Sequence, residues 1–163
     1  MKLGILTALA GEAARLPPPD ARLLDAHPFI SVIAGPGQAR AEAAARRLYA
    51  EGAEALMTFG VAGGLDPSLR PGDLVVASSI WNGDAPRYDC APPLVEALVA
   101  SLAPLAPRCA PLASLRSPVA DEVVKRALHA RHGCVAVDME SAGLARVAAE
   151  FGVPCAALRV VID

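Results

Sequence analysis

Three carboxylates near the end of the chain follow directly after apolar runs. Asp138 and Glu140 come after the run 135–137, and Asp163 comes after the run 158–162. Short apolar runs bounded by polar residues are typical of buried strands, so these acids are expected at strand ends. Such an arrangement suits a pocket in which one carboxylate holds a polyol and another protonates a leaving group.

Each acid also has an ordinary structural explanation. Asp138 can cap a helix that starts near residue 141, and Glu140 can complement that helix's dipole. Glu12 can be a first-turn helix acid, and Asp163 can be a solvated terminal residue. Taken together, however, acids follow the first, penultimate and last expected strands, and a glycine turn at 60–64 follows a middle one. All of these would then lie at one edge of a sheet.

The elements that must position these acids alternate along the chain. Apolar runs predict strands, and segments rich in Ala, Leu and Arg predict helices. The expected strands cover residues 3–8, 29–34, 55–59, 73–79, 110–115, 135–137 and 154–162. The expected helices cover residues 38–50, 93–102, 119–132 and 141–151. Continuously apolar strands that alternate with helices indicate an α/β fold, with a largely parallel sheet between helices on both faces.

Composition excludes several function classes. The 163 residues are enough for one domain, and they are 54% hydrophobic and 20% charged. A net charge of −2 and an aromatic content of 4% argue against nucleic-acid binding. No apolar run approaches the length of a transmembrane helix. The four cysteines have no zinc-ligand spacing, and Cys134 and Cys155 are expected to be buried thiols, so a cytoplasmic protein is expected.

The glycine-rich segments and the histidines are less informative. Residues 60–64, Gly-Val-Ala-Gly-Gly, match neither the dinucleotide fingerprint nor a phosphate-binding P-loop. They fit a tight connection as well as they fit a ligand-binding turn, and the same holds for Gly35-Pro36-Gly37. His129 and His132 lie three residues apart on an expected helix face, which is typical of solvated side chains, and His27 lies in a loop.

The motifs together resemble the nucleoside phosphorylase/nucleosidase superfamily. The segments concerned are the opening strand with Glu12, Gly35-Pro36-Gly37, the run 59–76, the segment 137–142 and the final strand 159–163. The nearest branches are methylthioadenosine/S-adenosylhomocysteine nucleosidases and hopanoid-associated phosphorylases. The resemblance implies a three-layer α/β/α sandwich around a mostly parallel, partly barrel-like mixed sheet. It also implies a nucleoside substrate and no metal or organic cofactor.

The resemblance assigns a role to most of the candidate residues. Asp163 would donate or share the proton that makes a purine base a good leaving group. Glu140 would accept hydrogen bonds from the ribose hydroxyls and stabilise the ribosyl cation, and Met139 would pack against the sugar. The base would lie against Ala62, Gly63 and Val119.

The nucleophile is the open question between two enzyme types. Glu12 resembles the water-activating glutamate of the nucleosidases. Thr58 stands where bacterial purine phosphorylases have a phosphate-binding Arg, and Val61 replaces a Ser that helps to hold phosphate. These features favour hydrolysis. Phosphorolysis with inorganic phosphate as co-substrate stays open, because Arg40 or Arg87 can supply phosphate contacts.

Gly37, Arg40 and Thr58 are accordingly the candidates for a phosphate or nucleophile site. A third alternative is a nucleoside-binding domain without turnover.

The chain also departs from the family in length. The stretches 13–28 and 82–90 are shorter than in the nucleosidases, which would leave the 5′ side open to a bulky or lipidic substituent. The single domain 1–163 ends before the helix that covers the base in the family, so we expect it to be incomplete at its C-terminus. Family members oligomerise, and a homodimer is therefore expected.

Overall fold

The structure, a computed structural model, describes residues 1–18, 21, 24, 27–83 and 87–163. Its strands are β1 (Leu3–Thr7), β2 (Phe29–Ile33), β3 (Ala55–Gly64), β4 (Leu74–Trp81), β5 (Tyr88–Asp89), β6 (Arg108–Ser114), β7 (Ala136–Asp138) and β8 (Cys155–Val161). Its helices are α1 (Ala10–Ala13), α2 (Gln38–Ala50), α3 (Pro92–Ser101), the 3₁₀ turn η1 (Ala103–Leu105), α4 (Glu122–His132) and α5 (Ser141–Phe151).

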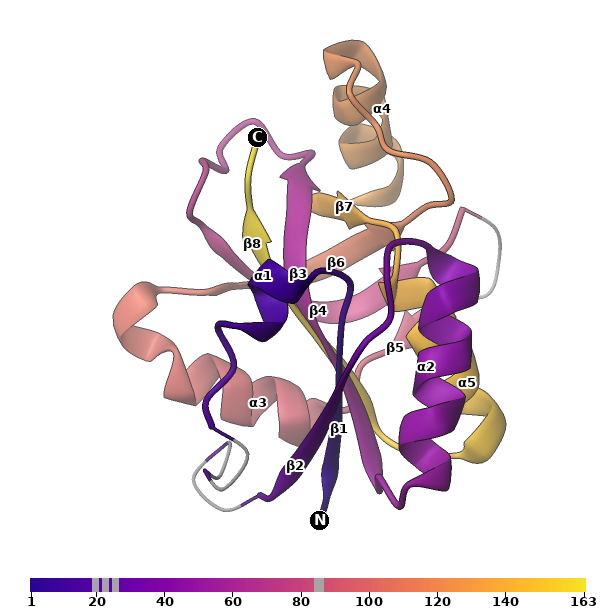
Figure 1. Ribbon diagram of the computed structural model, residues 1–163. Helices are drawn as coiled ribbons and strands as arrows, with labels where there is room; N and C mark the ends of the chain where they lie inside the picture. The colour runs from indigo at the N-terminus through magenta and orange to yellow at the C-terminus, as the bar shows by residue number, and fades with distance from the viewer. Residues whose placement is uncertain (19–20, 22–23, 25–26, 84–86) are drawn as a thin grey trace.

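The strands form one mixed sheet, part of which closes into a barrel. β3 pairs with β7, β7 with β6, β6 with β4, β4 with β8, and β8 again with β3. β1 and β2 extend this barrel from β3 in parallel (Figure 1). Five of the eight pairings within the described part of the chain are parallel. The expected α/β fold with a mostly parallel, partly barrel-like sheet is confirmed.

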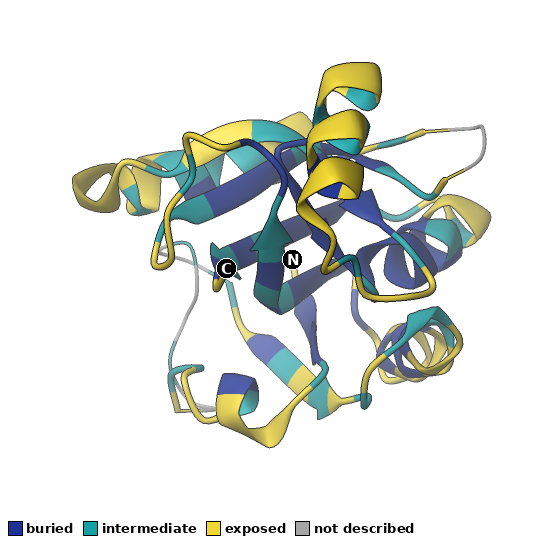
Figure 2. Ribbon diagram, turned by 90° about the horizontal axis from the view of Figure 1, so that it is seen from above, coloured by how far each residue is buried: buried dark blue, intermediate teal, exposed yellow. Residues whose placement is uncertain are grey.

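The strands are apolar on both sides because helices cover both faces of the sheet. Leu6 and Leu56 belong to a core with residues of α2 and α5, whereas Ile5 and Met57 belong to a core with α3. This alternation follows from the two-residue period of a strand. Figure 1 shows α2 and α5 side by side on one face and α3 on the other, and Figure 2 shows the buried strands between the exposed helix surfaces.

The largest difference from the expected elements concerns the glycine segment 60–64. It is no turn, because β3 continues as a strand to Gly64. β8 pairs with this end of β3 on one side, and β7 pairs with it on the other. Glycine has a low intrinsic preference for strands, so the sequence pattern suggested a turn, and the pairing on both sides overrides it.

Two boundaries differ for local reasons. Helix α4 begins at Glu122 and not at residue 119, because the Asp121 side chain accepts hydrogen bonds from the backbone of Val123 and Val124 at 2.8 and 3.0 Å. Such a cap defines a helix N-terminus. The stretch expected as loop after β4 contains the short strand β5, which pairs antiparallel with β4.

The described helices include none that is long and apolar enough to cross a membrane. Cys134 and Cys155 are buried free thiols, as expected from their apolar surroundings in the sequence.

Candidate active site

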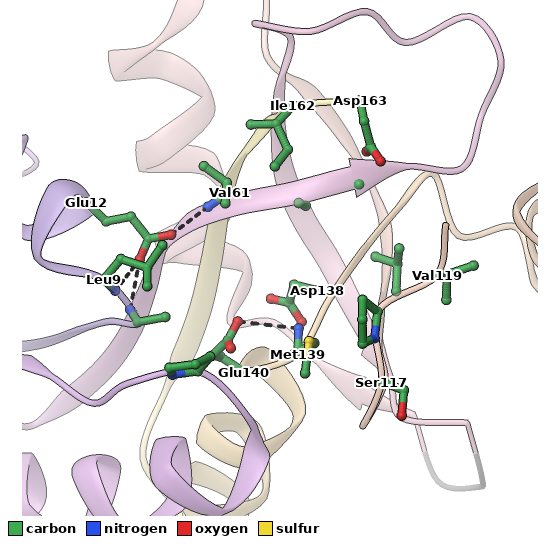
Figure 3. Close-up of a pocket in the computed structure, with 16 residues that line it drawn as sticks. Leu9, Glu12, Val61, Ser117, Val119, Asp138, Met139, Glu140, Ile162 and Asp163 are labelled. Carbon is green, nitrogen blue, oxygen red and sulfur yellow. Dashed lines mark hydrogen bonds between the residues drawn. The ribbon is translucent and has the colours of Figure 1, made fainter. Parts of the chain in front are cut away.

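A cavity of about 260 Å³ lies at the ends of β3, β7 and β8. The segment after β1, the short helix α1 and residues 117–119 complete its wall. Four acidic side chains line it, namely Glu12, Asp138, Glu140 and Asp163. Figure 3 shows Glu12, Glu140 and Asp163 on different sides of this cavity. Acids that lie far apart in the sequence therefore meet in one place.

Glu12 is held rigidly by backbone donors. Its Oε2 accepts hydrogen bonds from the N–H groups of Ala8 and Leu9 at 2.8 and 2.9 Å, and its Oε1 accepts one from Val61 at 3.0 Å (Figure 3). The carboxylate lies directly against Gly60, where an added Cβ would stand 2.6 Å from Oε1. The glycine therefore allows Glu12 to approach β3.

Gly60→Ala is expected to displace the Glu12 carboxylate. If Glu12 orients the nucleophile, as the resemblance implies, kcat should fall by roughly 10- to 100-fold, because small misplacements of reacting groups are costly. The fold should survive, since the side chain that must move is the end of a flexible glutamate. Gly11→Ala is the matched control, because nothing lies within 4 Å of a Cβ at Gly11. Steady-state kinetics and thermal denaturation of both variants test this, and equal kcat values for Gly60→Ala and wild type would refute the role of Gly60.

Glu140 stands at the N-terminus of α5 and is buried. Its Oε1 accepts a hydrogen bond from Gly37 N–H at 2.8 Å, and its Oε2 accepts one from Met139 N–H at 3.3 Å. Burial raises the pKa of Glu140, and the hydrogen bond from Gly37 opposes this effect. The carboxylate is thus fixed in position but is more readily protonated than an exposed glutamate.

A consequence is expected in the pH profile of catalysis. If ionised Glu140 is required, activity is lost as pH falls through its raised pKa. The acid limb of kcat/KM should therefore lie above the ordinary value of 4.5. Rates of the catalysed reaction measured between about pH 4 and 8 test this. An acid limb at or below the ordinary value would contradict the assignment.

Asp138 lies beside Glu140 in the sequence but has a different environment. Its Oδ2 accepts hydrogen bonds from Arg159 Nε at 2.7 Å and from the Ser141 hydroxyl, and Arg159 Nη2 lies 2.6 Å away. Its Oδ1 also accepts a hydrogen bond from Ser141 N–H at 3.3 Å. Asp138 therefore binds the first residue of α5, as its capping interpretation suggested, and is also one half of a buried ion pair. The pair joins the end of β7 to β8.

Asp163 pairs with a lysine that the sequence analysis did not single out. Lys125 Nζ donates to Asp163 Oδ2 at 2.9 Å, and Gly64 N–H donates to Oδ1 at 3.2 Å. Lys125 is 4% exposed, and its hydrogen bond to Asp163 raises its pKa, so the ammonium stays charged. The sequence did set Lys125 apart. Only Lys2 and Lys125 among the 15 basic residues are lysines, and the rest are Arg.

The structure brings most of the predicted site residues together. One cavity is lined by Glu12, Ala62, Gly63, Val119, Met139, Glu140 and Asp163. Gly37 and Arg40 line a second, neighbouring pocket.

Two other residues named as candidate phosphate ligands lie elsewhere. The Thr58 hydroxyl accepts a hydrogen bond from Arg159 Nη2 at 2.8 Å and is buried. Arg87 donates to the His132 carbonyl at 2.9 Å, away from the cavity. Within the ranges that the structure describes, no group of three or more His, Cys, Asp or Glu side chains could hold a metal ion.

Comparison with protein families shows to which family this chain belongs. Residues 21–163 match the family model of the phosphorylase superfamily. The chain belongs to the phosphorylase superfamily. No curated protein sequence matches it.

Several solved structures of nucleosidases have the same fold as this chain. The methylthioadenosine/S-adenosylhomocysteine nucleosidase (MTAN) of Helicobacter pylori is 24% identical, with a TM-score of 0.84 over 100% of this chain and 89% of that one. The S-adenosylhomocysteine nucleosidase of Streptococcus pyogenes is 24% identical, with a TM-score of 0.84 over 99% and 83%. Futalosine hydrolase of Helicobacter pylori is 22% identical, with a TM-score of 0.84 over 98% and 83%.

These findings confirm the resemblance inferred from the sequence motifs and the fold that it implies. The phosphorylase superfamily member described here is an enzyme of the nucleosidase/phosphorylase type, as expected. At these identities the solved structures establish the fold and leave the substrate to be argued from the site.

Proposed function

We propose that this protein cleaves the N-glycosidic bond of a purine, adenine-type nucleoside by attack of water on an oxocarbenium-like ribosyl group. Glu140 holds the ribose hydroxyls, and its negative charge stabilises the developing cation. Asp163 shares a proton with the base, and Glu12 orients the water. Met139 packs against the sugar, while Ala62, Gly63 and Val119 contact the base.

The observation that carries this proposal is the charge of the cavity wall. Among the described residues that line the cavity, four are acidic and none is Lys or Arg. Asp138 and Asp163 are paired with Arg159 and Lys125, so the acidic character rests on Glu12 and Glu140. Acidic groups suit a cationic transition state, and they repel a phosphate dianion. Thr58 is engaged by buried Arg159 and does not line the cavity. This supports hydrolysis over phosphorolysis.

The size of the 5′ substituent is a further part of the proposal. Leu9 and Ile162 line the cavity and are exposed to solvent, so apolar side chains border it at the surface. This supports room for a bulky 5′ substituent. The resemblance to hopanoid-associated phosphorylases suggests a lipidic substituent, whereas the arginines of a neighbouring pocket favour an anionic one.

A direct test is adenine release from 5′-deoxy-5′-methylthioadenosine, with and without millimolar inorganic phosphate. We expect equal rates and free 5-methylthioribose as the sugar product in both conditions. Strict dependence on phosphate, with 5-methylthioribose 1-phosphate as the product, would establish phosphorolysis instead. Tight binding without release would identify a binding domain. Asp163→Asn is the companion variant and should lower kcat by about 10²-fold or more.

A further inference from the structure

A second pocket, of about 490 Å³, lies beside the catalytic cavity and has the opposite charge. Its charged lining residues are Arg40, Arg116, Arg146 and Glu42. Three arginines and one glutamate therefore line it, in a chain whose net charge is −2. We call this the arginine pocket. Its charge is local and is not a consequence of overall composition.

The ion pairs inside the arginine pocket leave cationic groups available. Arg146 Nη1 donates to Glu42 Oε1 at 2.6 Å, so one guanidinium is neutralised by the single carboxylate. Arg40 lies across Gly35, where an added Cβ would stand 3.1 Å from Arg40 Cδ and 3.3 Å from Nη1. Gly35 also has a φ of +81°, which disfavours any larger residue there. The backbone at Gly35 thus makes room for the Arg40 side chain.

The arginine pocket adjoins the catalytic cavity on the side of Glu140. Pro36 lines both. Arg116 in one adjoins Ser117 in the other along the chain, and Gly37 in the arginine pocket donates its N–H to Glu140 in the cavity. A group that extends beyond Glu140 between these two walls therefore reaches Arg40 and Arg116.

The orientation of a bound nucleoside follows from the proposed roles of the acids. With the base at Asp163 and the ribose hydroxyls at Glu140, the 5′ carbon is the part of the sugar that can carry a substituent away from the base. We propose that the arginine pocket binds an anionic group, such as a carboxylate or phosphate, at the end of that 5′ substituent. This inference rests on the proposed function, because it uses the same orientation of the nucleoside.

The same geometry separates the arginine pocket from the nucleophile. Glu12 lines the catalytic cavity only, and Arg40 lines the arginine pocket only. An anion at Arg40 is therefore a part of the substrate or a free ion, and it is not the attacking group. Arginine favours carboxylate and phosphate because its planar fork can donate two parallel hydrogen bonds to them.

The test compares two adenine nucleosides that differ only at the end of a 5′-thioether, which carries a propionate or the corresponding carboxamide. We expect kcat/KM for the propionate to exceed that for the carboxamide by roughly tenfold at low salt, because Arg40 and Arg116 are exposed and their contacts are moderate. The preference should shrink in 0.5 M NaCl through screening. It should disappear in the Arg40→Gln/Arg116→Gln double variant, for which kcat/KM should be the same with the propionate as with the carboxamide.

Two further variants make the result specific. Glu42→Gln removes the carboxylate that neutralises Arg146, so it should increase the preference for the propionate. Arg47→Gln removes an exposed arginine of the same helix that pairs with Glu51 outside the pocket, so it should leave the preference unchanged. Equal kcat/KM for both substrates, or a preference that the double variant retains, would overturn the proposal.

The remaining outcomes distinguish an anion that belongs to the substrate from a free anion and from a lipidic substituent. Sulfate that competes with the propionate substrate but not with the carboxamide supports the proposal. Sulfate binding without any propionate preference would mean a site for free anions only. A stronger preference for a long alkyl thioether than for the propionate would indicate a lipidic substituent and overturn the proposal. If no nucleoside releases adenine, the dissociation constants of the same pair decide, so failure of the proposed hydrolysis is distinguished from failure of the arginine pocket.

Discussion

Glu140→Gln is expected to reduce kcat for base release by roughly 10³-fold, or about 4 kcal/mol of transition-state stabilisation. The amide keeps the shape of the side chain and can still hydrogen-bond the ribose hydroxyls, but it lacks the negative charge that opposes the developing ribosyl cation. Substrate affinity should therefore change much less than kcat. Pre-steady-state and steady-state measurements of adenine release provide the comparison.

The same variant should not be destabilised through loss of the carboxylate charge. Because burial raises the pKa of Glu140, the folded state binds more protons than the unfolded state between the ordinary and the raised pKa. The free energy of unfolding of the wild type therefore falls as pH rises through this window. Gln carries no such penalty at neutral pH, so its melting temperature should equal or exceed that of the wild type.

Glu150→Gln is the control for this experiment. Glu150 lies on α5, and its carboxylate pairs with Arg46 at the surface, outside the cavity. Its kinetics should match those of the wild type. Wild-type rates in Glu140→Gln would rule out the role given to Glu140.

Arg159→Met is expected to cause the largest loss of stability, about 3–5 kcal/mol, because it leaves the buried Asp138 carboxylate without its partner. Arg159 is 1% exposed and donates to Asp138, to Thr58 and to the Leu158 carbonyl. For a chain of this size the loss corresponds to a fall in melting temperature of roughly 10 °C. Urea denaturation measures it directly.

A double variant separates the charge from the packing. Asp138→Asn combined with Arg159→Met removes both charges and keeps an oxygen that can accept from Ser141. It should be more stable than Arg159→Met alone. Arg47→Met, which breaks an exposed pair with Glu51, should cost less than about 1 kcal/mol. A double variant as unstable as Arg159→Met would show that packing, and not the unpaired charge, dominates.

Local sequence was sufficient for the elements whose patterns are strong. Helices α2 and α5 begin and end where the sequence predicts, because Ala-rich segments are stopped by glycine at residues 52 and 152. The buried strands were recognisable because both of their faces are apolar. The glycine end of β3 was interpreted wrongly as a turn, since its strand conformation depends on pairing with β7 and β8 and not on its own residues.

Some residues of the candidate site could likewise be recognised from the sequence, and others could not. Glu12, Glu140 and Asp163 stood out because each follows a strand, and the ends of neighbouring strands lie close together in space. Lys125 and Arg159 received no role from the sequence, because neither residue type nor spacing says which carboxylate a cation will meet. Their partners are 38 and 21 residues away along the chain. Those contacts depend on how α4 packs against the barrel and on how β8 pairs within it.

The acidic strand ends were thus determined by the sequence alone, since they follow from local patterns of apolar and acidic residues. The superfamily was also visible there, through the resemblance of several motifs to known members. Only the tertiary structure showed which acids line the cavity and that Asp138 forms a buried ion pair with Arg159. It also placed Arg40 with Arg116 in a second pocket, which Glu12 does not line. The physical reason is that charge pairing and burial arise between elements, where the sequence carries no distance information.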